Sequence, residues 1–218
     1  MSETPELWLS LDLSSQTGSL AVHSHSGAEL RCLAEVTLHD GGEHSESVLP
    51  GLEQVLSEAG TSLTLIDRYL TTTGPGSFTG LRIAFAALKA FHLANAKPIE
   101  TLAAHEARAL AYLKTMNEKP ETLWVSTQIT RDSFLLTEFK ITQGGLVKIG
   151  DTTVAELNKE RFADLDLLTD KPAEVGTHFP IEARHLAECL EQAQSRETLT
   201  TDSAVAASSP TYFGSKNY

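Results

Sequence analysis

The chain has 218 residues, of which 41% are hydrophobic, and a formal net charge of −12 at pH 7. This length and apolar share suit one large domain or two small ones with a buried core. The chain has 29 acidic against 17 basic side chains and no clustered run of lysine or arginine. Such a surface repels phosphate backbones, which argues against tight direct binding of nucleic acid.

Cysteine usage and the N-terminus bear on the cellular compartment. Cys32 and Cys189 lie far apart and form no CxxC motif, which favours a reducing compartment. The N-terminal residues are acidic and lack the basic region of a signal peptide. No apolar run reaches the roughly 18 residues that a membrane span needs. We therefore expect a soluble, cytoplasmic protein that makes no contact with a membrane.

Three strands are predicted at the start of the chain. Their ranges are Leu7–Leu13, Ser19–Ser24 and Leu30–Leu38, and the turns between them indicate an antiparallel meander. The first turn follows Asp12 and contains Ser14. An aspartate at this position is typical of a turn cap.

A helix from about Ser47 to Ala59 follows the meander. Apolar residues at helical spacing form one stripe: Val48, Leu49, Leu52, Val55, Leu56 and Ala59. Pro50 fits a helix that begins near Ser47, because N–H groups of the first turn have no helical partner. His39 and His44 precede it, but the glycines between them break any helix that could pair them. No His-Glu-x-x-His motif occurs, so we predict no metal site.

A strand over residues 66–72 leads into a glycine-rich stretch, residues 73–84, with the sequence TGPGSFTGLRIA. An apolar helix follows, so the stretch is predicted to be a strand–loop–helix junction. Ser77 or Thr79 can cap that helix. Free N–H groups at a helix start can also hold an anion, here with Gly74 and Gly76 beside them. The lysine of a phosphate-binding P-loop is absent, and both interpretations, a structural junction and a phosphate cradle, stay open.

The helix predicted over Gly80–Ala96 is apolar nearly all round. One face carries Leu81, Ala84, Phe85, Leu88 and Phe91. The second face carries Ile83, Ala87, Ala90 and Ala94. A helix with two apolar faces must be buried on two sides, and one side can cover its own sheet. The small side chains of the second face allow close approach of another helix, either the preceding one or one from a partner subunit.

The second half of the chain gives weaker signals. A third helix is predicted over Glu100–Met116, and the polar residues 115–122, which include a proline, indicate a domain boundary. We therefore predict an N-terminal domain of residues 1–115 and a smaller C-terminal domain of residues 116–218. Strands are predicted over Leu123–Ile129, Phe134–Ile141 and Leu146–Gly150, and an amphipathic helix over Ile181–Arg196.

The ten residues 74–83, GPGSFTGLRI, resemble the signature of the TsaB (YeaZ) family. The Pro210–Tyr212 segment also resembles the family's Pro-x-Tyr tail. The chain departs from the family at Ile129, in a segment that is commonly Asp-Ala-Arg, and at Gly214, where an arginine is usual. The resemblance therefore covers the first half of the chain closely and the second half loosely.

The resemblance implies a fold class and a function. The fold is an α/β actin-like ATPase fold (sugar kinase, Hsp70 and actin) of two lobes, with the second lobe degenerate. The predicted order βββαβα of the first half agrees with it. The function implied is that of a non-catalytic scaffold or dimerisation subunit, which binds and activates TsaD in the formation of threonylcarbamoyladenosine (t6A) in tRNA.

The family resemblance also implies the partners and the contact surface. TsaB proteins pair with TsaD through the two helices that span residues 46–59 and 80–96 here, and they meet TsaE in a larger complex. They reach tRNA only through that complex, and a homodimer through the same helices is allowed when TsaD is absent. The expected interface residues are Ile83, Ala87, Ala90, Ala94, Gln54 and Glu58.

The alternative function is an ATPase or kinase of the actin-like superfamily. In that superfamily the turn after the first strand touches a nucleotide phosphate, and its aspartate helps to position a metal. The vestigial phosphate contacts here would be Asp12, Ser14, Gly74, Gly76 and Ser77. Such an enzyme needs a second Asp-x-Gly loop, and the nearest candidates, at Asp132 and Asp151, lack the glycine. We therefore expect no catalytic residues and no tightly bound cofactor, with weak ATP or ADP binding at most.

A glycoprotease activity has been attached to relatives of the family by name. No Ser/His/Asp or metal arrangement in the sequence supports that activity here.

Overall fold

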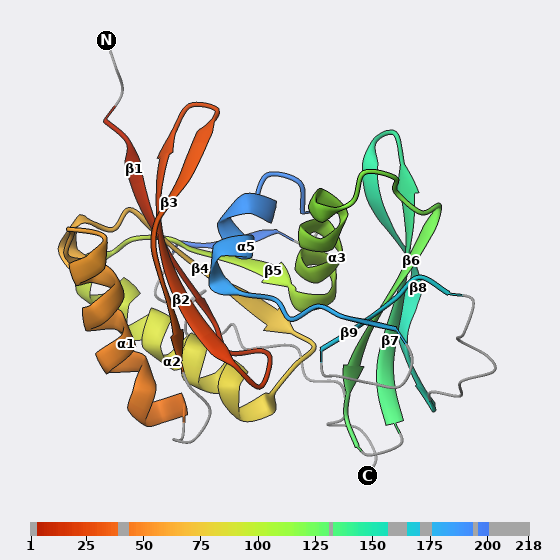
Figure 1. The fold of residues 1–218 in the computed structure, drawn as a ribbon. Coiled ribbons are helices and arrows are strands. Elements are labelled where there is room, and N and C mark those ends of the chain that lie inside the picture. The colour runs from red at the N-terminus through yellow and green to blue at the C-terminus, as the bar shows by residue number, and fades with distance from the viewer. Residues whose placement is uncertain are drawn as a thin grey trace.

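The structure is a computed structural model that describes residues 4–38, 44–130, 133–156, 165–170, 176–193 and 196–200. The described elements form two β-sheets with helices packed against them and between them (Figure 1). Several residues discussed above lie outside the described ranges, namely His39, Asp132, Gly214 and the Pro210–Tyr212 segment.

The first sheet has six strands in the order β11-β5-β4-β1-β2-β3. Their bounds are β1 Glu6–Asp12, β2 Gly18–Ser26, β3 Glu29–Leu38, β4 Arg68–Gly74, β5 Ile99–Ala103 and β11 Glu197–Leu199. The first three strands form the predicted antiparallel meander. β4 and β5 run parallel to β1, and β11 pairs with β5 in the antiparallel direction.

The second sheet has five strands in the order β10-β9-β6-β7-β8. Their bounds are β6 Thr122–Gln128, β7 Ser133–Thr142, β8 Gly145–Glu156, β9 Leu167–Thr169 and β10 Thr177–His178. β6, β7 and β8 are antiparallel, and β9 and β10 add parallel strands on the other side of β6. Both sheets thus consist of an antiparallel meander extended by parallel strands, which confirms the predicted two-lobed, actin-like α/β fold.

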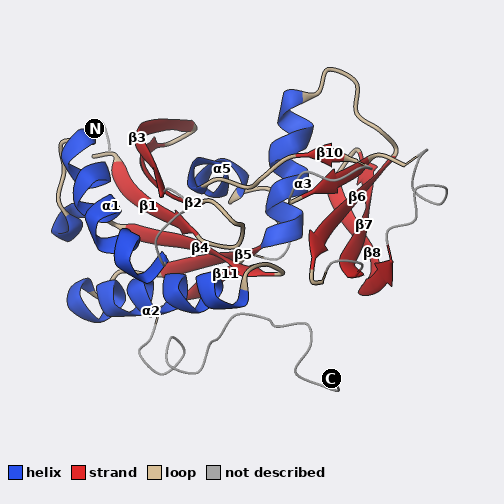
Figure 2. Ribbon diagram, turned by 60° about the horizontal axis from the view of Figure 1, so that its bottom comes forward, coloured by secondary structure: helices blue, strands red, loops and turns tan. Residues whose placement is uncertain are grey.

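Helices cover both faces of the first sheet. α1 His44–Glu58 and α2 Phe78–Asn95 pack on one face, with the 3₁₀ turn η1 Leu63–Leu65 between them in the chain. α5 Ala183–Cys189 lies on the opposite face, and α3 Ala104–Thr115 lies between the two sheets (Figure 2). Among the described residues, no helix combines the length and the apolar character that crossing a membrane requires.

Alternate residues of β1 point to opposite faces of the sheet, as in any strand. Leu9 and Leu11 join the apolar core beneath α1 and α2. Trp8 joins a second core, which is formed with α3, α5 and the second sheet. Ser10 and Asp12 are also fully buried on the side of Trp8, so polar groups lie inside the α5 face of the sheet.

Two of the predicted helices are shorter than expected. The segment Glu100–Met116 begins as a strand, because Ile99–Ala103 is buried and pairs with β4, and only Ala104–Thr115 is helical. The predicted helix Ile181–Arg196 is confined to α5. In both cases pairing with a distant strand or packing on a sheet overrides the local helical pattern.

Three smaller differences concern the start of α1 and the C-terminal part. α1 begins at His44, so Pro50 lies inside the helix instead of in its first turn. The short strands β9, β10 and β11 were not predicted. α5 and β11 lie on the first sheet although they come from the C-terminal part of the chain. The domain boundary near residue 115 stays a prediction.

Candidate functional site

The first candidate site is the turn after β1, where Asp12 ends the strand. Its carboxylate is fully buried and accepts hydrogen bonds from Ser14 Oγ at 3.0 Å, Ser14 N at 3.4 Å and Thr72 Oγ1 at 2.9 Å. Burial raises the pKa of the Asp12 carboxyl, and the hydrogen bonds from Thr72 and Ser14 oppose this shift. Both carboxylate oxygens are therefore used within the chain to tie the turn to β4.

The glycine-rich loop lies directly against that turn. Ser77 N donates to the Ser14 carbonyl oxygen at 2.7 Å. A Cβ on Gly76 would lie 2.4 Å from the same oxygen, and a Cβ on Gly80 would lie 2.0 Å from the Leu13 carbonyl oxygen. Only glycine allows two backbone segments to approach this closely. The glycines are thus explained by packing of the loop on the first turn.

Ser77, one of the two residues predicted as a possible cap, also caps α2. Its Oγ accepts from Gly80 N at 3.2 Å. The Ser77 amide and hydroxyl, like the Asp12 carboxylate, are thus engaged with the protein itself. This geometry favours the structural junction over the phosphate cradle, and the phosphate contacts at Ser14, Gly74, Gly76 and Ser77 stay a prediction.

The second candidate site is the outer surface of α1 and α2. The residues predicted for the second face of α2 do not share one environment. Ile83 and Ala87 are half-buried and pack against the core, whereas Ala90 and Ala94 are exposed. On α1, Gln54 and Glu58 are exposed, and Gln54 Nε2 donates to Glu58 Oε1 at 2.9 Å.

Sequence reasoning missed the two most exposed of the large apolar side chains on these helices. Leu49 on α1 is 60% exposed, and Leu93 near the end of α2 is 66% exposed. Leu49 was assigned to the buried stripe because it fits helical spacing, although it lies at the edge of that stripe. Ala86, Ala90 and Leu93 follow each other at helical spacing on the exposed side of α2. This spacing is the signal that could have identified the outward face.

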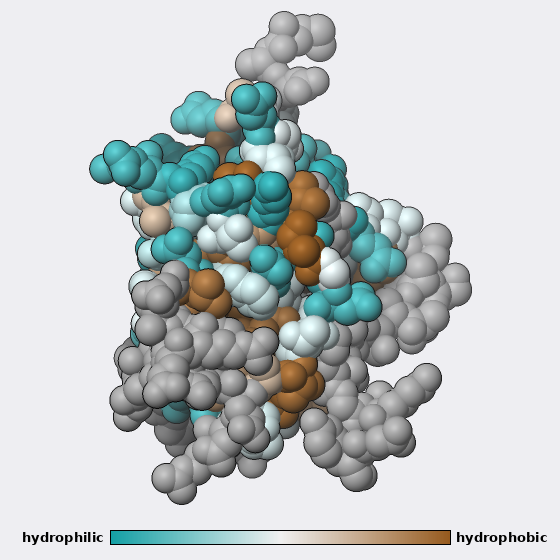
Figure 3. Space-filling view, turned by 90° about the vertical axis from the view of Figure 1, so that its right-hand side faces the viewer, coloured by the Kyte–Doolittle hydropathy of each residue, from teal (hydrophilic) through white to brown (hydrophobic). Residues whose placement is uncertain are grey.

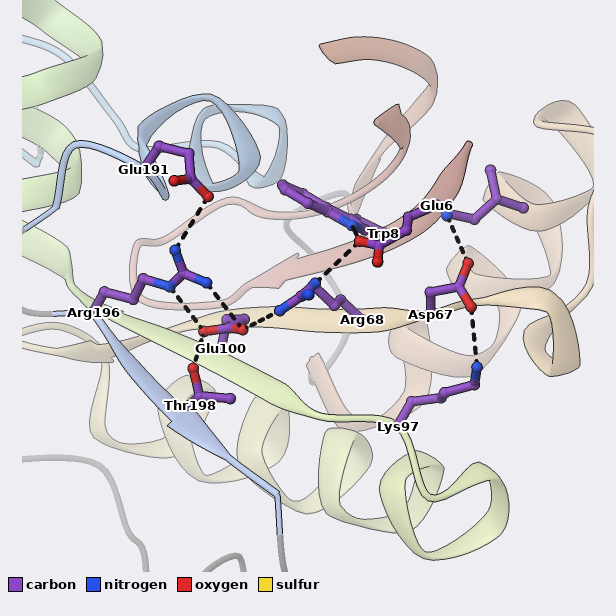
Figure 4. Close-up of polar contacts among 10 residues, drawn as sticks. Glu6, Trp8, Asp67, Arg68, Lys97, Glu100, Glu191, Arg196 and Thr198 are labelled. Atoms are coloured by element: carbon purple, nitrogen blue, oxygen red, sulfur yellow. Dashed lines mark hydrogen bonds and ion pairs between the residues drawn. The ribbon is translucent and has the colours of Figure 1, made fainter. Parts of the chain in front are cut away.

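A third region lies where β11 pairs with β5 at the edge of the first sheet (Figure 4). Glu100 is fully buried and accepts from Arg68 Nη1 at 2.6 Å, Arg196 Nε at 3.1 Å and Thr198 Oγ1 at 2.6 Å. Burial raises the pKa of Glu100, but the bonds from the two arginines and Thr198 outweigh it, so the pKa is lowered. No sequence pattern indicates this cluster, because the residues that bond to Glu100 lie 32, 96 and 98 positions from it.

The two arginines of this cluster also line a cavity of about 550 Å³ on the α5 face. Arg68 lies over the Trp8 ring at 5.7 Å, and that ring also stacks on His25 at 4.3 Å. Glu6 accepts from Trp8 Nε1 at 2.9 Å and from Arg68 Nε at 3.3 Å. The charged groups of the cavity are thus paired with one another. These pairs connect neighbouring strands of the first sheet.

Apolar side chains are also exposed on the second sheet. Val147, Ile149 and Val154 of β8 are 37%, 42% and 57% exposed. Figure 3, which looks at the molecule from the side of this sheet, shows apolar patches scattered among polar ones. Ile129, at the point where the sequence departs from the TsaB pattern, is 38% exposed in the turn that precedes β7.

No group of three or more His, Cys, Asp or Glu side chains in the described part of the chain is arranged to hold a metal ion. The side chain of His44 is outside the described set, as is all of His39. The prediction that the chain has no metal site therefore stays a prediction.

Comparisons with known proteins point to one family. The family model "TsaD: tRNA N6-adenosine threonylcarbamoyltransferase" matches residues 33–174. The tRNA threonylcarbamoyladenosine biosynthesis protein TsaB of Escherichia coli (strain K12) is 39% identical over 57 residues, which are 26% of this chain and 25% of that protein.

Two solved structures from Pseudomonas aeruginosa have the same fold. YeaZ superposes with a TM-score of 0.69 at 18% identity, covering 95% of this chain and 100% of that chain. An uncharacterized protein with similarity to peptidase YeaZ superposes with a TM-score of 0.70 at 20% identity, covering 95% and 99%.

Proposed function

The chain belongs to the family that the TsaD model describes, and within that family it is a TsaB (YeaZ) member. On this premise we propose that it is a non-catalytic subunit, which binds and activates the separate protein TsaD in t6A formation. The proposal places the chain in the cytoplasm, with tRNA reached only through the complex. TsaE is proposed as a further partner, and a homodimer is proposed when TsaD is absent.

The observation that carries the proposal is the outer surface of α1 and α2. Leu49 and Leu93 are large apolar side chains that are mostly exposed, and Ala86, Ala90 and Ala94 leave the α2 backbone accessible beside them. Exposed apolar side chains that form one continuous surface are typical of a protein–protein contact, and the proposal takes those of α1 and α2 as parts of such a surface. Small side chains let the axes of two helices approach to roughly 8 Å.

The geometry of the first turn supports a role without turnover. A phosphate or a metal-bound water would need the Asp12 carboxylate or the Ser77 amide, and both bond to the chain itself. The acidic chain also opposes direct tRNA binding, since a net charge of −12 repels the phosphate backbone. Both points favour an accessory subunit over an ATPase or kinase.

The test is co-purification and titration with TsaD. Ala90→Arg places a long charged side chain on the exposed face of α2, where it has room in the free protein, so the variant should fold normally. We expect it to weaken TsaD binding at least tenfold, because a buried unpaired charge at an interface is costly. Ala87→Arg is less informative, since Ala87 already packs against the core.

The matched control is Val154→Arg, which adds the same side chain at an exposed apolar position on β8. We expect it to bind TsaD as the wild type does. Equal binding by Ala90→Arg and the wild type would reject this surface. Sedimentation of the isolated chain tests the homodimer, which Ala90→Arg should dissociate if it uses the same helices.

A further inference from the structure

α3 lies between the two sheets (Figure 2), and His105 in its first turn is buried. His105 Nδ1 lies 2.7 Å from Thr137 Oγ1 of β7, and His105 Nε2 lies 2.9 Å from Thr127 Oγ1 of β6. Thr137 Oγ1 in turn lies 2.8 Å from Thr152 Oγ1 of β8. One side chain of α3 is thus joined to two neighbouring strands of the second sheet directly, and to a third strand through a hydroxyl group.

This buried polar network is complete at its centre, because each ring nitrogen of His105 has a hydroxyl partner. Burial, with Arg108 and Lys148 nearby, holds the pKa of His105 well below its usual range, so the ring is neutral near pH 7. A neutral imidazole donates from one nitrogen and accepts at the other, and a threonine hydroxyl can do either. A buried network whose members are all satisfied rigidifies a structure and specifies one arrangement of it.

The rest of α3 is attached to the first sheet. The helix follows directly from β5, and Cys189 Sγ of α5 donates to the Ala107 carbonyl oxygen at 3.7 Å. α5 itself is held on the first sheet, where Ala183 N donates to Ser19 Oγ of β2 at 2.7 Å. The position of the second sheet relative to the first therefore depends on how α3 meets β6 and β7.

An apolar core crosses the same boundary. Leu110 of α3 belongs to one buried cluster with Val125 of β6 and Phe139 of β7. Apolar packing stabilises such a contact but tolerates changes of shape, whereas a hydrogen bond weakens steeply when its geometry changes. The two kinds of contact can therefore have different roles.

We propose that His105 is a positioning residue, whose bonds to Thr127 and Thr137 select one arrangement of the two sheets, while the apolar core supplies the stability of their contact. The competing explanation is that the apolar core sets both the stability and the arrangement. The two explanations differ in what happens when the whole polar network is replaced by apolar groups of similar shape.

The experiment uses the triple variant His105→Leu, Thr127→Val, Thr137→Val. Removing all three polar groups together avoids leaving one of them buried without its partner, a change that would destabilise the protein for another reason. The matched control is Ser126→Ala, because the buried Ser126 hydroxyl donates to the Leu168 carbonyl oxygen at 3.0 Å, a bond that stays within the second sheet.

The measurements are the melting temperature and the distance between the sheets. Spin labels go on Cys32 of β3, which is exposed, and on an added cysteine, Val147→Cys, of β8. Cys189 should stay unlabelled, because it is buried and burial raises the pKa of its thiol to about 12.

We expect the triple variant to melt within roughly 5 °C of the wild type, because apolar groups replace the network without unsatisfied partners. Its distance distribution should be broader than that of the wild type. Ser126→Ala should keep the narrow distribution of the wild type.

A folded triple variant with the wild-type distribution would overturn the proposal, because the apolar core alone would then set the arrangement. An insoluble or strongly destabilised triple variant would also contradict it, since the network would then supply the stability that the proposal assigns to the core. Equal broadening in Ser126→Ala would show that the distribution responds to any lost buried hydrogen bond, and the specific role of His105 would be rejected.

Discussion

The two faces of the first sheet are formed by alternate residues of the same strands, yet they bury different chemistry. Beneath α1 and α2, Leu9 and Leu11 belong to a core made of apolar side chains. On the α5 face, Ser10, His23 and Glu100 are as fully buried as those leucines. Among the described strands of this sheet, the buried ionisable side chains Asp12, His23 and Glu100 thus lie on the side that faces α3 and α5.

The difference shows that the two faces are held together by different forces. The α1/α2 face is stabilised by burial of apolar area, which depends little on the exact partner. The α5 face depends on specific pairs, since each buried polar group needs its own partner or destabilises the fold. Mutations and pH changes should therefore destabilise the α5 face by changing the charge of buried groups. Mutations should destabilise the α1/α2 face by changing side-chain volume.

The largest effect is expected at Glu100. Glu100→Ala removes a buried carboxylate that accepts from three side chains, so we expect a loss of about 3 kcal/mol of unfolding free energy. Arg68 and Arg196 remain 28% and 32% exposed, so water can partly solvate them. Glu191→Ala is the control, because Glu191 is 70% exposed and its pair with Arg196 is a surface pair worth under about 1 kcal/mol.

The pH dependence of the same cluster follows from the lowered pKa of Glu100. Its contribution to stability is complete above its ordinary pKa of 4.5 and is lost as the pH falls through the lower value of the folded state. Urea unfolding of wild type and Glu100→Gln should therefore converge as the pH falls below 4.5. Curves that stay parallel down to the lowest pH would show that Glu100 acts through packing alone.

The next effect is expected at His23, which is 1% exposed. Neither ring nitrogen makes a normal hydrogen bond to the described residues. Burial lowers the pKa of His23 from 6.5 to about 4, and the nearby Arg184 backbone opposes this only in part. Between these two pH values, His23 thus binds a proton in the unfolded chain but not in the folded chain. Wild type should lose roughly 3 kcal/mol of stability between pH 7 and pH 4 from this group.

His23→Leu tests this assignment by removing the titrating group from the same site. The variant should be at least as stable as the wild type at pH 7, because the imidazole is neutral there and gains little from its surroundings. The measurement is urea unfolding at pH 7, 5.5 and 4. An equally steep fall in stability for wild type and His23→Leu would assign the acid sensitivity to other groups.

The contrast between the faces also explains which parts of the fold were predictable. The strands of the first meander and α1 and α2 are long and periodic, so local pattern identifies them. The segment Ile99–Ala103 runs into the alanine-rich start of α3 and has no turn residue between them. Its identity as β5 depends on pairing with β4 and β11, which the local sequence does not encode.

The candidate sites were predictable to the same uneven degree. The Ser77 cap follows from residue types at a short spacing. The packing of Gly76 and Gly80 on the first turn was not predicted, because it joins residues more than 60 positions apart. Of the four residues expected on the second face of α2, Ala90 and Ala94 are exposed, whereas Ile83 and Ala87 pack inward. The side chains that bond to Glu100 lie 32, 96 and 98 residues away, so no local pattern could reveal them.

A smaller effect is expected at Gly80, on the α1/α2 side. Alanine normally favours a helix over glycine by about 1 kcal/mol. Here the added Cβ would lie 2.0 Å from the Leu13 carbonyl oxygen, which is backbone and cannot rotate away. We expect Gly80→Ala to destabilise by about 2 kcal/mol, measured by urea unfolding.

The control for Gly80 is Gly144→Ala in the turn before β8. There the nearest atom to the added Cβ is Thr142 Oγ1 at 3.8 Å, so the change should stay within about 0.5 kcal/mol. A stabilised Gly80→Ala protein would show that the loop does not rest on the first turn, and the account of the junction would be wrong.

The smallest effect is expected at Ser77, where the two interpretations of the glycine loop make opposite predictions. As a helix cap, Ser77 Oγ accepts from Gly80 N, so Ser77→Ala should cost about 1 kcal/mol. Ser77→Asp keeps a capping oxygen and places a negative charge at the helix N-terminus, so its stability should match the wild type.

If Ser77 instead contacts a phosphate, the carboxylate of Ser77→Asp would repel that anion. Urea unfolding with and without added inorganic phosphate separates these roles. Phosphate that stabilises the wild type but not Ser77→Asp would restore the cradle, whereas wild-type stability without any phosphate effect leaves Ser77 as a cap.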